Sequence, residues 1–302
     1  MKKAIIDVGT NTAHILIAEV IDNKIDRICY KKRFYTFLGE GGLDHISQNA
    51  IDRLMEALES FEISITEYGC QQVSVLATEA LRSAANGPLI HQNLTSRFGW
   101  PIHIISGQKE AQYIYQGANQ STDLSDGSSL VMDIGGGSVE FIYVRDGVVS
   151  FQESYPIGIS RLYEQYHISE PISNMEVDRI ISHLEDTLSE MWTQVNLGHP
   201  IKLVGCAGTF EVFLDQKDVD NLDISATIVD TQSVQSLWHE IKTKDISERS
   251  LVKGLPPARV KYIVVAVLLI KYVIDRLSLS DFVVSKYALK EGSIIDGDLF
   301  LD

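Results

Sequence analysis

The chain has 302 residues, of which 45% are hydrophobic, and its mean hydropathy is nearly neutral at +0.02. This composition indicates a folded globular protein and excludes a disordered chain or a fibre. The length suffices for two domains, because single hydrophobic cores rarely extend beyond about 250–300 residues. A formal net charge of −15 disfavours nucleic acid, anionic membranes and polyanionic ligands unless a local site overcomes it.

The cysteines and the N-terminus predict a cytoplasmic protein with no membrane partner. Cys29, Cys70 and Cys206 are isolated, and an odd number of cysteines cannot form a complete disulfide set, so we expect a reducing compartment. The chain reaches Asp7 before a signal-peptide core can form. The longest apolar run, residues 262–270, would span only about half a membrane.

Short β-forming runs alternate with segments of helical periodicity, which predicts an α/β fold. In the first half we expect strands at residues 4–9, 14–20, 25–36, 73–77 and 102–106, a helix beginning after Ser47, and helices after the last two strands. In the second half we expect strands at residues 148–155, 201–204 and 282–285, and helices at 174–195, at 260–277 and from 288. The run at 262–270 is apolar all round, which favours a buried core helix over an exposed dimer face.

An internal repeat relates the two halves of the chain. Residues 4–17 read as an apolar strand ending in Asp7, a turn containing glycine, and a second strand that includes His14. Residues 130–143 repeat this order around Asp133. Each half therefore opens with one hairpin, and we expect two similar domains.

The polar residues 120–129 lie between the halves and have no periodicity, which predicts a domain boundary there. We expect domains at residues 1–124 and 125–302, with the terminal helix able to pack back on the first domain. The P-loop pattern, HExxH, a paired Cys/His cluster and the GxSxG elbow are absent from the sequence, which disfavours those NTPases, zinc proteases and α/β-hydrolases.

The turns after the buried strands predict a site for an anion. Glycines at 135–137 followed by Ser138 can direct several backbone N–H groups at phosphate oxygens, because glycine permits close approach. One such turn is also typical of an ordinary hairpin, but residues 7–12 repeat it and residues 204–209 form a third small-residue turn. Asp133 and Glu140 flank the glycines and supply the oxygen ligands that Mg²⁺ prefers.

Six segments together resemble the exopolyphosphatase and guanosine pentaphosphate phosphatase family: residues 7–14, 77–86, 105–111, 133–140, 158–162 and 288–292. They follow the family order over essentially the whole chain. The resemblance implies two similar actin-like (ribonuclease H-like) α/β domains with an active-site cleft between them. Longer members carry additional helical domains, so this chain is similar to the short two-domain form.

The resemblance also implies roles for individual residues. Glu110 matches the glutamate that activates the attacking water, while Asp133 and Glu140 match carboxylates that organise Mg²⁺ and the reacting phosphate. Asp7 occupies the equivalent place in the first repeat and is a third candidate ligand. Arg82 is a catalytic candidate, and phosphate contacts are implied for Thr10, Asn11, Gly135, Gly136, Gly137, Ser138, Gly208 and Thr209.

Three positions depart from the family pattern. Members commonly have two consecutive glutamates where this chain has Lys109-Glu110, and Lys109 could alter substrate preference. Cys206-Ala207-Gly208-Thr209 replaces a loop that is usually richer in Ser and Thr. Lys290 replaces an arginine, so a point charge stands where a planar bidentate group is usual.

Residues 242–290 contain ten basic and four acidic side chains, a local balance of +6 within an acidic chain. They could form a basic lane for the downstream phosphates of a long substrate, with Arg259 among the phosphate-binding residues. The alternative is that these side chains lie on solvated faces of surface helices.

These observations predict an Mg²⁺-dependent exopolyphosphatase, a phosphoric-anhydride hydrolase that releases the terminal phosphate of inorganic polyphosphate. Hydrolysis of the 5′-terminal phosphate of guanosine pentaphosphate (pppGpp) would use the same residues and stays open. A sugar or acetate kinase of the same superfamily fits less well, and a non-catalytic regulator that binds polyphosphate or the nucleotide is the alternative from another class. The resemblance allows a homodimer, and we expect no nucleic-acid partner.

Overall fold

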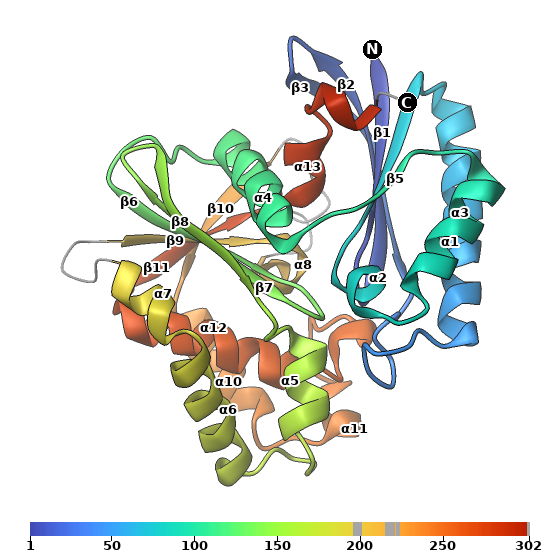
Figure 1. Ribbon diagram of the computed structural model, residues 1–302. Helices are drawn as coiled ribbons and strands as arrows, with labels where there is room; N and C mark the ends of the chain where they lie inside the picture. The colour runs from blue at the N-terminus through green and yellow to red at the C-terminus, as the bar shows by residue number, and fades with distance from the viewer. Residues whose placement is uncertain (196–200, 215–220, 222–223, 301–302) are drawn as a thin grey trace. The chain divides into compact units, whose positions relative to one another are not determined.

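The computed structural model describes residues 1–195, 201–214, 221 and 224–300, and the chain forms two compact units, each with its own sheet (Figure 1). The first unit comprises Met1–Gln120, Gly135–Gly137 and Tyr287–Asp302, and the second comprises Ser121–Ile134 and Ser138–Lys286. The C-terminal segment is therefore grouped with the first unit; the predicted ranges placed it in the second domain but allowed its helix to pack back on the first.

The first unit is built on a five-stranded sheet of order β3-β2-β1-β4-β5. Its strands are β1 (Lys2–Val8), β2 (Thr12–Ile21), β3 (Lys24–Tyr35), β4 (Gln72–Ala77) and β5 (Ile102–Ile104). Its helices are α1 (Gln48–Tyr68), α2 (Glu79–Ser83), α3 (Gly87–Phe98), α4 (Gly107–Ser121) and α13 (Leu289–Ser293), with a 3-10 turn η3 at Gly297–Phe300. Helices α1 and α3 lie on one face of this sheet, and α13 lies on the other (Figure 1).

The second unit has a six-stranded sheet of order β10-β11-β9-β6-β7-β8. Its strands are β6 (Ser128–Ile134), β7 (Val139–Arg145), β8 (Val148–Tyr155), β9 (Ile201–Cys206), β10 (Ala226–Asp230) and β11 (Asp281–Ser285). Its helices are α5 (Ile159–Tyr166), α6 (Asn174–Thr187), α7 (Ser189–Gln194), α8 (Ala207–Phe210), α10 (Gln232–Ile241), α11 (Ile246–Arg249) and α12 (Ile263–Leu277), with 3-10 turns at Glu211–Phe213 (η1) and Pro257–Arg259 (η2).

The two sheets share one topology, as the repeat in the sequence predicts. In the first unit β1 pairs antiparallel with β2, so that Asp7 lies opposite His14, and parallel with β4. In the second unit β6 pairs antiparallel with β7, so that Asp133 lies opposite Glu140, and parallel with β9. The α/β fold with two similar halves is therefore confirmed, and His14 lies on the first hairpin as expected.

Equivalent tight turns follow these hairpins. Asp22 and Asn23 join β2 to β3, and Asp146 and Gly147 join β7 to β8; all four residues have positive φ, between 47° and 76°. Two-residue turns with positive φ at both positions match the right-handed twist of paired strands. Asp, Asn and Gly tolerate that conformation, so local sequence fixes where both hairpins reverse.

The C-terminal segment packs closely on the first unit. Helix α13 contacts β1 and β2, and η3 contacts β4. A Cβ atom on Gly292 would lie 1.8 Å from the Tyr113 carbonyl oxygen, and one on Gly117 would lie 2.0 Å from the Ala288 carbonyl oxygen. Neither position can accept a side chain without backbone movement, so these glycines let α4 and α13 cross at short range.

Helix α12 forms the core of the second unit. Its residues from Ile263 to Ile270 are all buried, which confirms the core helix predicted from the all-round apolar run. Helices α6, α10 and α12 lie together on one face of the sheet (Figure 1). Over the described residues, none of the helices combines the length and the apolar character needed to cross a membrane.

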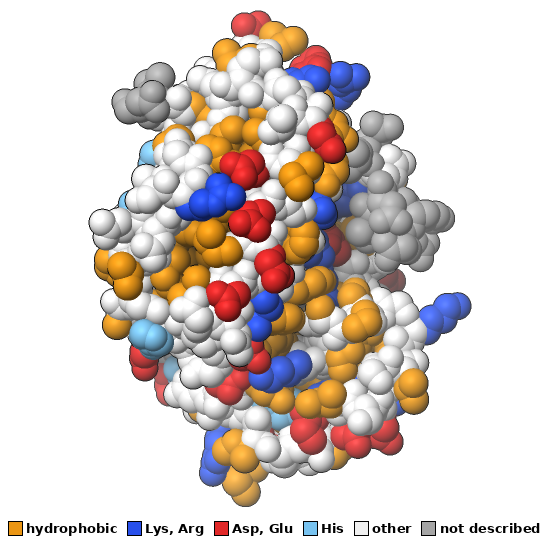
Figure 2. Space-filling model, turned by 90° about the vertical axis from the view of Figure 1, so that its right-hand side faces the viewer, with side chains coloured by type: hydrophobic (Ala, Val, Ile, Leu, Met, Phe, Trp, Pro, Cys, Tyr) orange, Lys and Arg blue, Asp and Glu red, His pale blue; other side chains and the backbone are white. Residues whose placement is uncertain are grey.

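Basic side chains are mixed with acidic ones on one face of the molecule. On the face drawn in Figure 2, several acidic side chains lie close together, with Lys or Arg side chains next to some of them. Where charges of both signs are mixed, the local electrostatic potential depends on close ion pairs more than on the net charge of −15.

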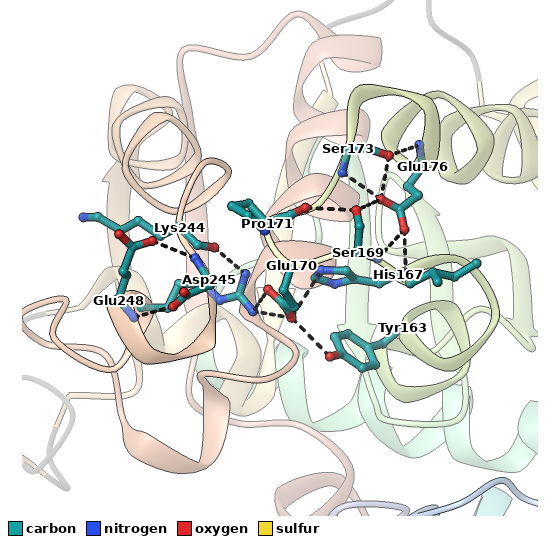
Figure 3. Close-up of polar contacts among 12 residues, drawn as sticks. Tyr163, His167, Ser169, Glu170, Pro171, Ser173, Glu176, Lys244, Asp245 and Glu248 are labelled. Atoms are coloured by element: carbon teal, nitrogen blue, oxygen red, sulfur yellow. Dashed lines mark hydrogen bonds and ion pairs between the residues drawn. The ribbon is translucent and has the colours of Figure 1, made fainter.

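A buried polar cluster connects α5, α6 and α11 in the second unit (Figure 3). The Glu176 carboxylate accepts hydrogen bonds from the hydroxyls and backbone N–H groups of Ser169 and Ser173. Nearby, Arg249 is fully buried and pairs with Glu170 at 2.8 Å, and the Nε2 atom of His167 lies 3.4 Å from the same carboxylate. The predicted basic lane therefore cannot include Arg249, because its guanidinium is buried and paired with Glu170 inside this cluster.

We expect acid to destabilise the second unit through this cluster. Burial lowers the pKa of His167 below its ordinary value of 6.5, with Arg249 acting in the same direction and Glu170 and Glu176 opposing. Because folded His167 binds fewer protons than the unfolded chain does, its contribution to stability is complete above about pH 6.5 and is lost as the pH falls further. Burial alone would raise the pKa of Glu176, but hydrogen bonds from Ser169 and Ser173 keep this pKa well below its ordinary range. Protonation of Glu176 at lower pH therefore also destabilises the folded chain.

The measurement is urea unfolding at about pH 7 and pH 5 in a Trp100→Phe background, in which the fluorescence comes from Trp192 and Trp238, both in the second unit. The midpoint should fall on acidification, and His167→Gln should reduce that fall. The exposed His239 on α10 provides a matched control: the unfolding midpoint of His239→Gln should fall on acidification as much as that of the wild type. An equal fall of the midpoint in the two variants would contradict the assignment to His167.

Candidate active site

The glycine turn at 135–137 is grouped with the first unit, where it contacts the β1–β2 turn. A Cβ atom on Gly136 would lie 2.7 Å from Nδ2 of Asn11, and one on Gly137 would lie 2.8 Å from Oγ1 of Thr10. The missing side chains therefore allow backbone and polar side chains to approach closely, as a phosphate-binding turn requires. The glycine turn thus lies beside Thr10 and Asn11, for which the family resemblance also implies phosphate contacts.

Glu110 lies in the first turn of α4 and its side chain is only 9% exposed. Arg82, at the end of α2, donates from Nη1 to Oε2 of Glu110 at 3.3 Å and to the carbonyl oxygen of Ile105 at 2.6 Å. The second terminal nitrogen, Nη2, donates to Oε2 of Glu79 at 2.7 Å. Two sequence-predicted residues, Glu110 and Arg82, are therefore in direct contact, and Glu79 is part of the same network.

Asp7 lies at the end of β1, beside the N-terminus of the C-terminal segment. Desolvation raises the pKa of Asp7 to about 6, with Lys290 lowering it and Glu291 raising it. Glu291 is fully buried, pairs with Lys31 at 2.8 Å and accepts from the backbone N–H of Ala288. A nearby cation would stabilise a desolvated carboxylate at this position, which fits the predicted role of Asp7 as a metal ligand.

In the second unit, Asp133 and Glu140 are direct partners across β6 and β7, so both carboxylates lie on one face of the sheet. They are 8% and 2% exposed. Oε1 of Glu140 accepts from the hydroxyls of Ser138 and Ser154, each at 2.7 Å. Two neighbouring buried carboxylates repel one another unless positive charge offsets them, and such a donor set fits Mg²⁺, which proteins bind through one or two carboxylates plus water and phosphate oxygens. Over the described parts of the chain, there is no cluster of three or more potential metal-binding side chains.

Three more predicted phosphate-binding residues lie in the second unit: Gly208 and Thr209 in α8, directly after β9, and Arg259 in η2, before α12. The hydroxyl of Thr209 donates to the carbonyl oxygen of Ile134, at the end of β6, which holds α8 against that strand. Arg259 pairs with Glu211 at 3.5 Å, with both side chains 15% exposed. Ser138, bonded to Glu140, is the predicted turn residue that the structure connects directly to a candidate metal ligand.

The basic segment 242–290 is largely neutralised by acidic residues elsewhere in the second unit. Lys244, Lys261 and Arg259 pair with carboxylates that precede the segment, as does the buried Arg249: Glu240, Glu164, Glu211 and Glu170, respectively. The count of +6 took no account of these partners, so it overstates the positive charge that a ligand would meet.

Lys109 is held by the C-terminal segment. Its ammonium group lies 3.6 Å from the Asp296 carboxylate and over the ring of Tyr113, whose hydroxyl donates to the same carboxylate at 2.7 Å. These contacts direct the positive charge of Lys109 to Asp296, and Glu110 next to it in sequence pairs with Arg82.

Sequence reasoning missed two polar residues that contact candidate residues, one in each unit. Glu79 was visible in principle, because its spacing from Arg82 is three residues within a predicted helix, a separation that allows ion pairing. Ser154 could not be found without the β7–β8 register, which places it opposite Glu140.

Three comparisons relate this chain to known proteins. The model of the Ppx/GppA phosphatase family matches residues 16–299. An exopolyphosphatase from Cytophaga hutchinsonii, solved by crystallography, is 28% identical with a TM-score of 0.90, over 98% of both chains. The crystal structure of the Aquifex aeolicus family member is 24% identical with a TM-score of 0.79, over 99% of this chain and 98% of that one, and supports the fold.

A curated relative from Pseudoalteromonas translucida, named guanosine-5'-triphosphate,3'-diphosphate pyrophosphatase, is 26% identical over 96% of this chain. The match covers 58% of that longer protein. Because the family model spans almost the whole chain and the two sheets reproduce the fold of the solved members, the chain belongs to the Ppx/GppA phosphatase family and is a hydrolase with the two-domain actin-like fold.

Proposed function

We propose that the protein is an exopolyphosphatase that releases the terminal phosphate of inorganic polyphosphate. The observation that carries this proposal is the contact between Glu110 and Arg82: a shielded carboxylate, held by a guanidinium, in the unit that also contains the glycine turn. A carboxylate of this kind can accept a proton, and the turn and Thr10 can receive phosphate oxygens.

In the proposed reaction, water attacks the terminal phosphorus in line with the bridging oxygen. Glu110 accepts one proton of the water while the new O–P bond forms and the bond from phosphorus to the bridging oxygen breaks. Orthophosphate and a polyphosphate shorter by one residue result, and the proton held by Glu110 is then returned to solvent. Positioning and stabilisation of charge on the phosphoryl oxygens supply most of the acceleration in such reactions, and a well-placed general base contributes about 10²–10⁴-fold.

Asp133 and Glu140, which are direct partners in the second unit, would hold the Mg²⁺ ion, and Asp7 of the first unit stays a predicted ligand. When bound, the ion would neutralise charge on the phosphate oxygens. Ser138 and Ser154 orient the Glu140 carboxylate through their hydroxyls, so that its position is fixed before any ligand binds. This arrangement supports the proposed metal dependence without an additional ligand from histidine or cysteine.

The name of the Pseudoalteromonas relative favours a second candidate, hydrolysis of the 5′-terminal phosphate of pppGpp. We rank polyphosphate first because the match to the Cytophaga exopolyphosphatase extends over 98% of both chains at higher identity. The non-catalytic regulator remains the alternative if neither compound is cleaved. Cytoplasmic location, a homodimer, and the lack of nucleic-acid and membrane partners also stay predictions.

A phosphate-release assay separates these functions. Purified protein is given long-chain polyphosphate or pppGpp, each with Mg²⁺ and with excess EDTA. We expect release from polyphosphate with a kcat/KM at least about tenfold above that for pppGpp, and loss of release with EDTA, because Mg²⁺ would neutralise charge on the phosphate oxygens. A preference for pppGpp would reverse the ranking, and tight binding without release would favour the regulator.

A further inference from the structure

Helix α2 carries a carboxylate whose position depends on the residues one turn later. Oε1 of Glu79 accepts from the hydroxyl of Ser83 at 2.9 Å, and Oε2 accepts from Nη2 of Arg82 at 2.7 Å. The Glu79 side chain is 13% exposed. Both of its oxygens therefore have protein donors, and its conformation is fixed within a single turn of helix.

Arg82 transmits this constraint to α4. The guanidinium group is planar and rigid, so fixing Nη2 also fixes the direction in which Nη1 donates. Nη1 reaches both the Ile105 carbonyl oxygen and Oε2 of Glu110. Glu79 and Glu110 lie on different helices, and Arg82 is the cation that both of them contact.

Charge in the network supports the same conclusion. One guanidinium is shared by two carboxylates, and the bond to Glu79, at 2.7 Å, is shorter than the bond to Glu110, at 3.3 Å. Without Glu79, Arg82 could turn fully toward Glu110 or toward a phosphate, and either movement would change the position of the base.

We propose that Glu79 is a positioning residue that acts through Arg82 to hold Glu110 in the orientation needed to receive a proton from water. The inference rests on the proposed function for its catalytic consequence, whereas the coupling of the three side chains does not depend on any substrate. Glu79 need not touch the reacting atoms for this role.

Variants of Glu79 test the proposal by kinetics. Glu79→Ala should lower kcat about tenfold and change KM less than about threefold, because misplacement of a catalytic group lowers turnover more than binding. Glu79→Gln keeps an oxygen acceptor for Nη2 at the same reach and should recover most of kcat. Glu79→Asp keeps the charge but shortens the reach, and should remain impaired. Glu62→Ala, which removes an exposed glutamate paired with Arg97 on the same unit, is the matched control and should retain wild-type kinetics.

A double-mutant comparison tests whether the effect passes through Arg82. In the background of Arg82→Ala, the further change Glu79→Ala should cost less than about twofold in kcat. A full additional tenfold loss, or a change in KM alone, would overturn the proposal. If Glu79→Asp recovers kcat and Glu79→Gln does not, the charge of Glu79 matters rather than its reach. This result would also overturn the proposal.

A measurement without substrate keeps the inference separate from the proposed function. In urea unfolding followed by far-UV circular dichroism, the midpoint shifts of Glu79→Ala and Arg82→Ala should be non-additive in the double variant, as should those of Glu79→Ala and Glu110→Gln. If the wild type cleaves neither polyphosphate nor pppGpp, the proposed function fails while this coupling still stands. Additive shifts for both pairs would overturn the inference whatever the activity.

Discussion

Glu110→Gln should abolish most phosphate release while leaving the fold intact. Glutamine has nearly the same shape, and its amide oxygen can still accept the hydrogen bond from Nη1 of Arg82. It cannot take a proton from the attacking water at neutral pH, so we expect kcat to fall by about 10²–10⁴-fold. KM should change little, since the substrate's other contacts remain. Steady-state phosphate release over a range of polyphosphate concentrations measures both constants.

Glu59→Gln makes the same chemical change at a distant place. Glu59 is half-exposed on α1 and its partner is Arg97, so the variant should keep wild-type turnover. Circular dichroism and unfolding midpoints of both variants would show that any loss comes from chemistry. Turnover within about threefold of wild type in Glu110→Gln would remove Glu110 from the role of general base.

Asp133→Asn should weaken the binding of Mg²⁺, and both activity and stability measurements should show this. The Asp133 carboxylate lies directly opposite Glu140 on one sheet face, and removing its charge takes away half of that carboxylate pair. We expect the Mg²⁺ concentration for half-maximal activity to rise at least about tenfold, and kcat at saturating substrate to fall about 10²-fold at ordinary Mg²⁺. Titration of phosphate release with MgCl₂ gives both values.

A thermal unfolding series provides a readout that does not require turnover. Mg²⁺ should raise the Tm of the wild type, because a ligand that binds only the native state stabilises it, and should raise that of Asp133→Asn much less. Asp146→Asn, in the β7–β8 turn where asparagine tolerates positive φ, should respond to Mg²⁺ as the wild type does. An equal Mg²⁺ shift in Asp133→Asn and wild type would exclude Asp133 as a ligand.

The sequence alone determined the features that depend on local pattern. Apolar β-forming runs and the internal repeat predicted one hairpin at the start of each half, and the repeat predicted that Asp133 would occupy the place of Asp7. The all-round apolar run predicted the buried helix α12. These features follow from neighbouring residues, because strand alternation, turn conformation and helix periodicity are set within a few positions.

Tertiary structure decided which side chains share charge and hydrogen bonds. It buried Arg249 against Glu170, gave several other residues of the basic segment acidic partners from earlier in the chain, and placed the C-terminal segment on the first unit. It also joined Glu79 and Glu110 through Arg82, residues that a linear motif leaves on separate helices. Such pairings depend on distances between elements far apart in sequence, and a desolvated charge must find a partner wherever the fold provides one, which residue counts along the chain cannot specify.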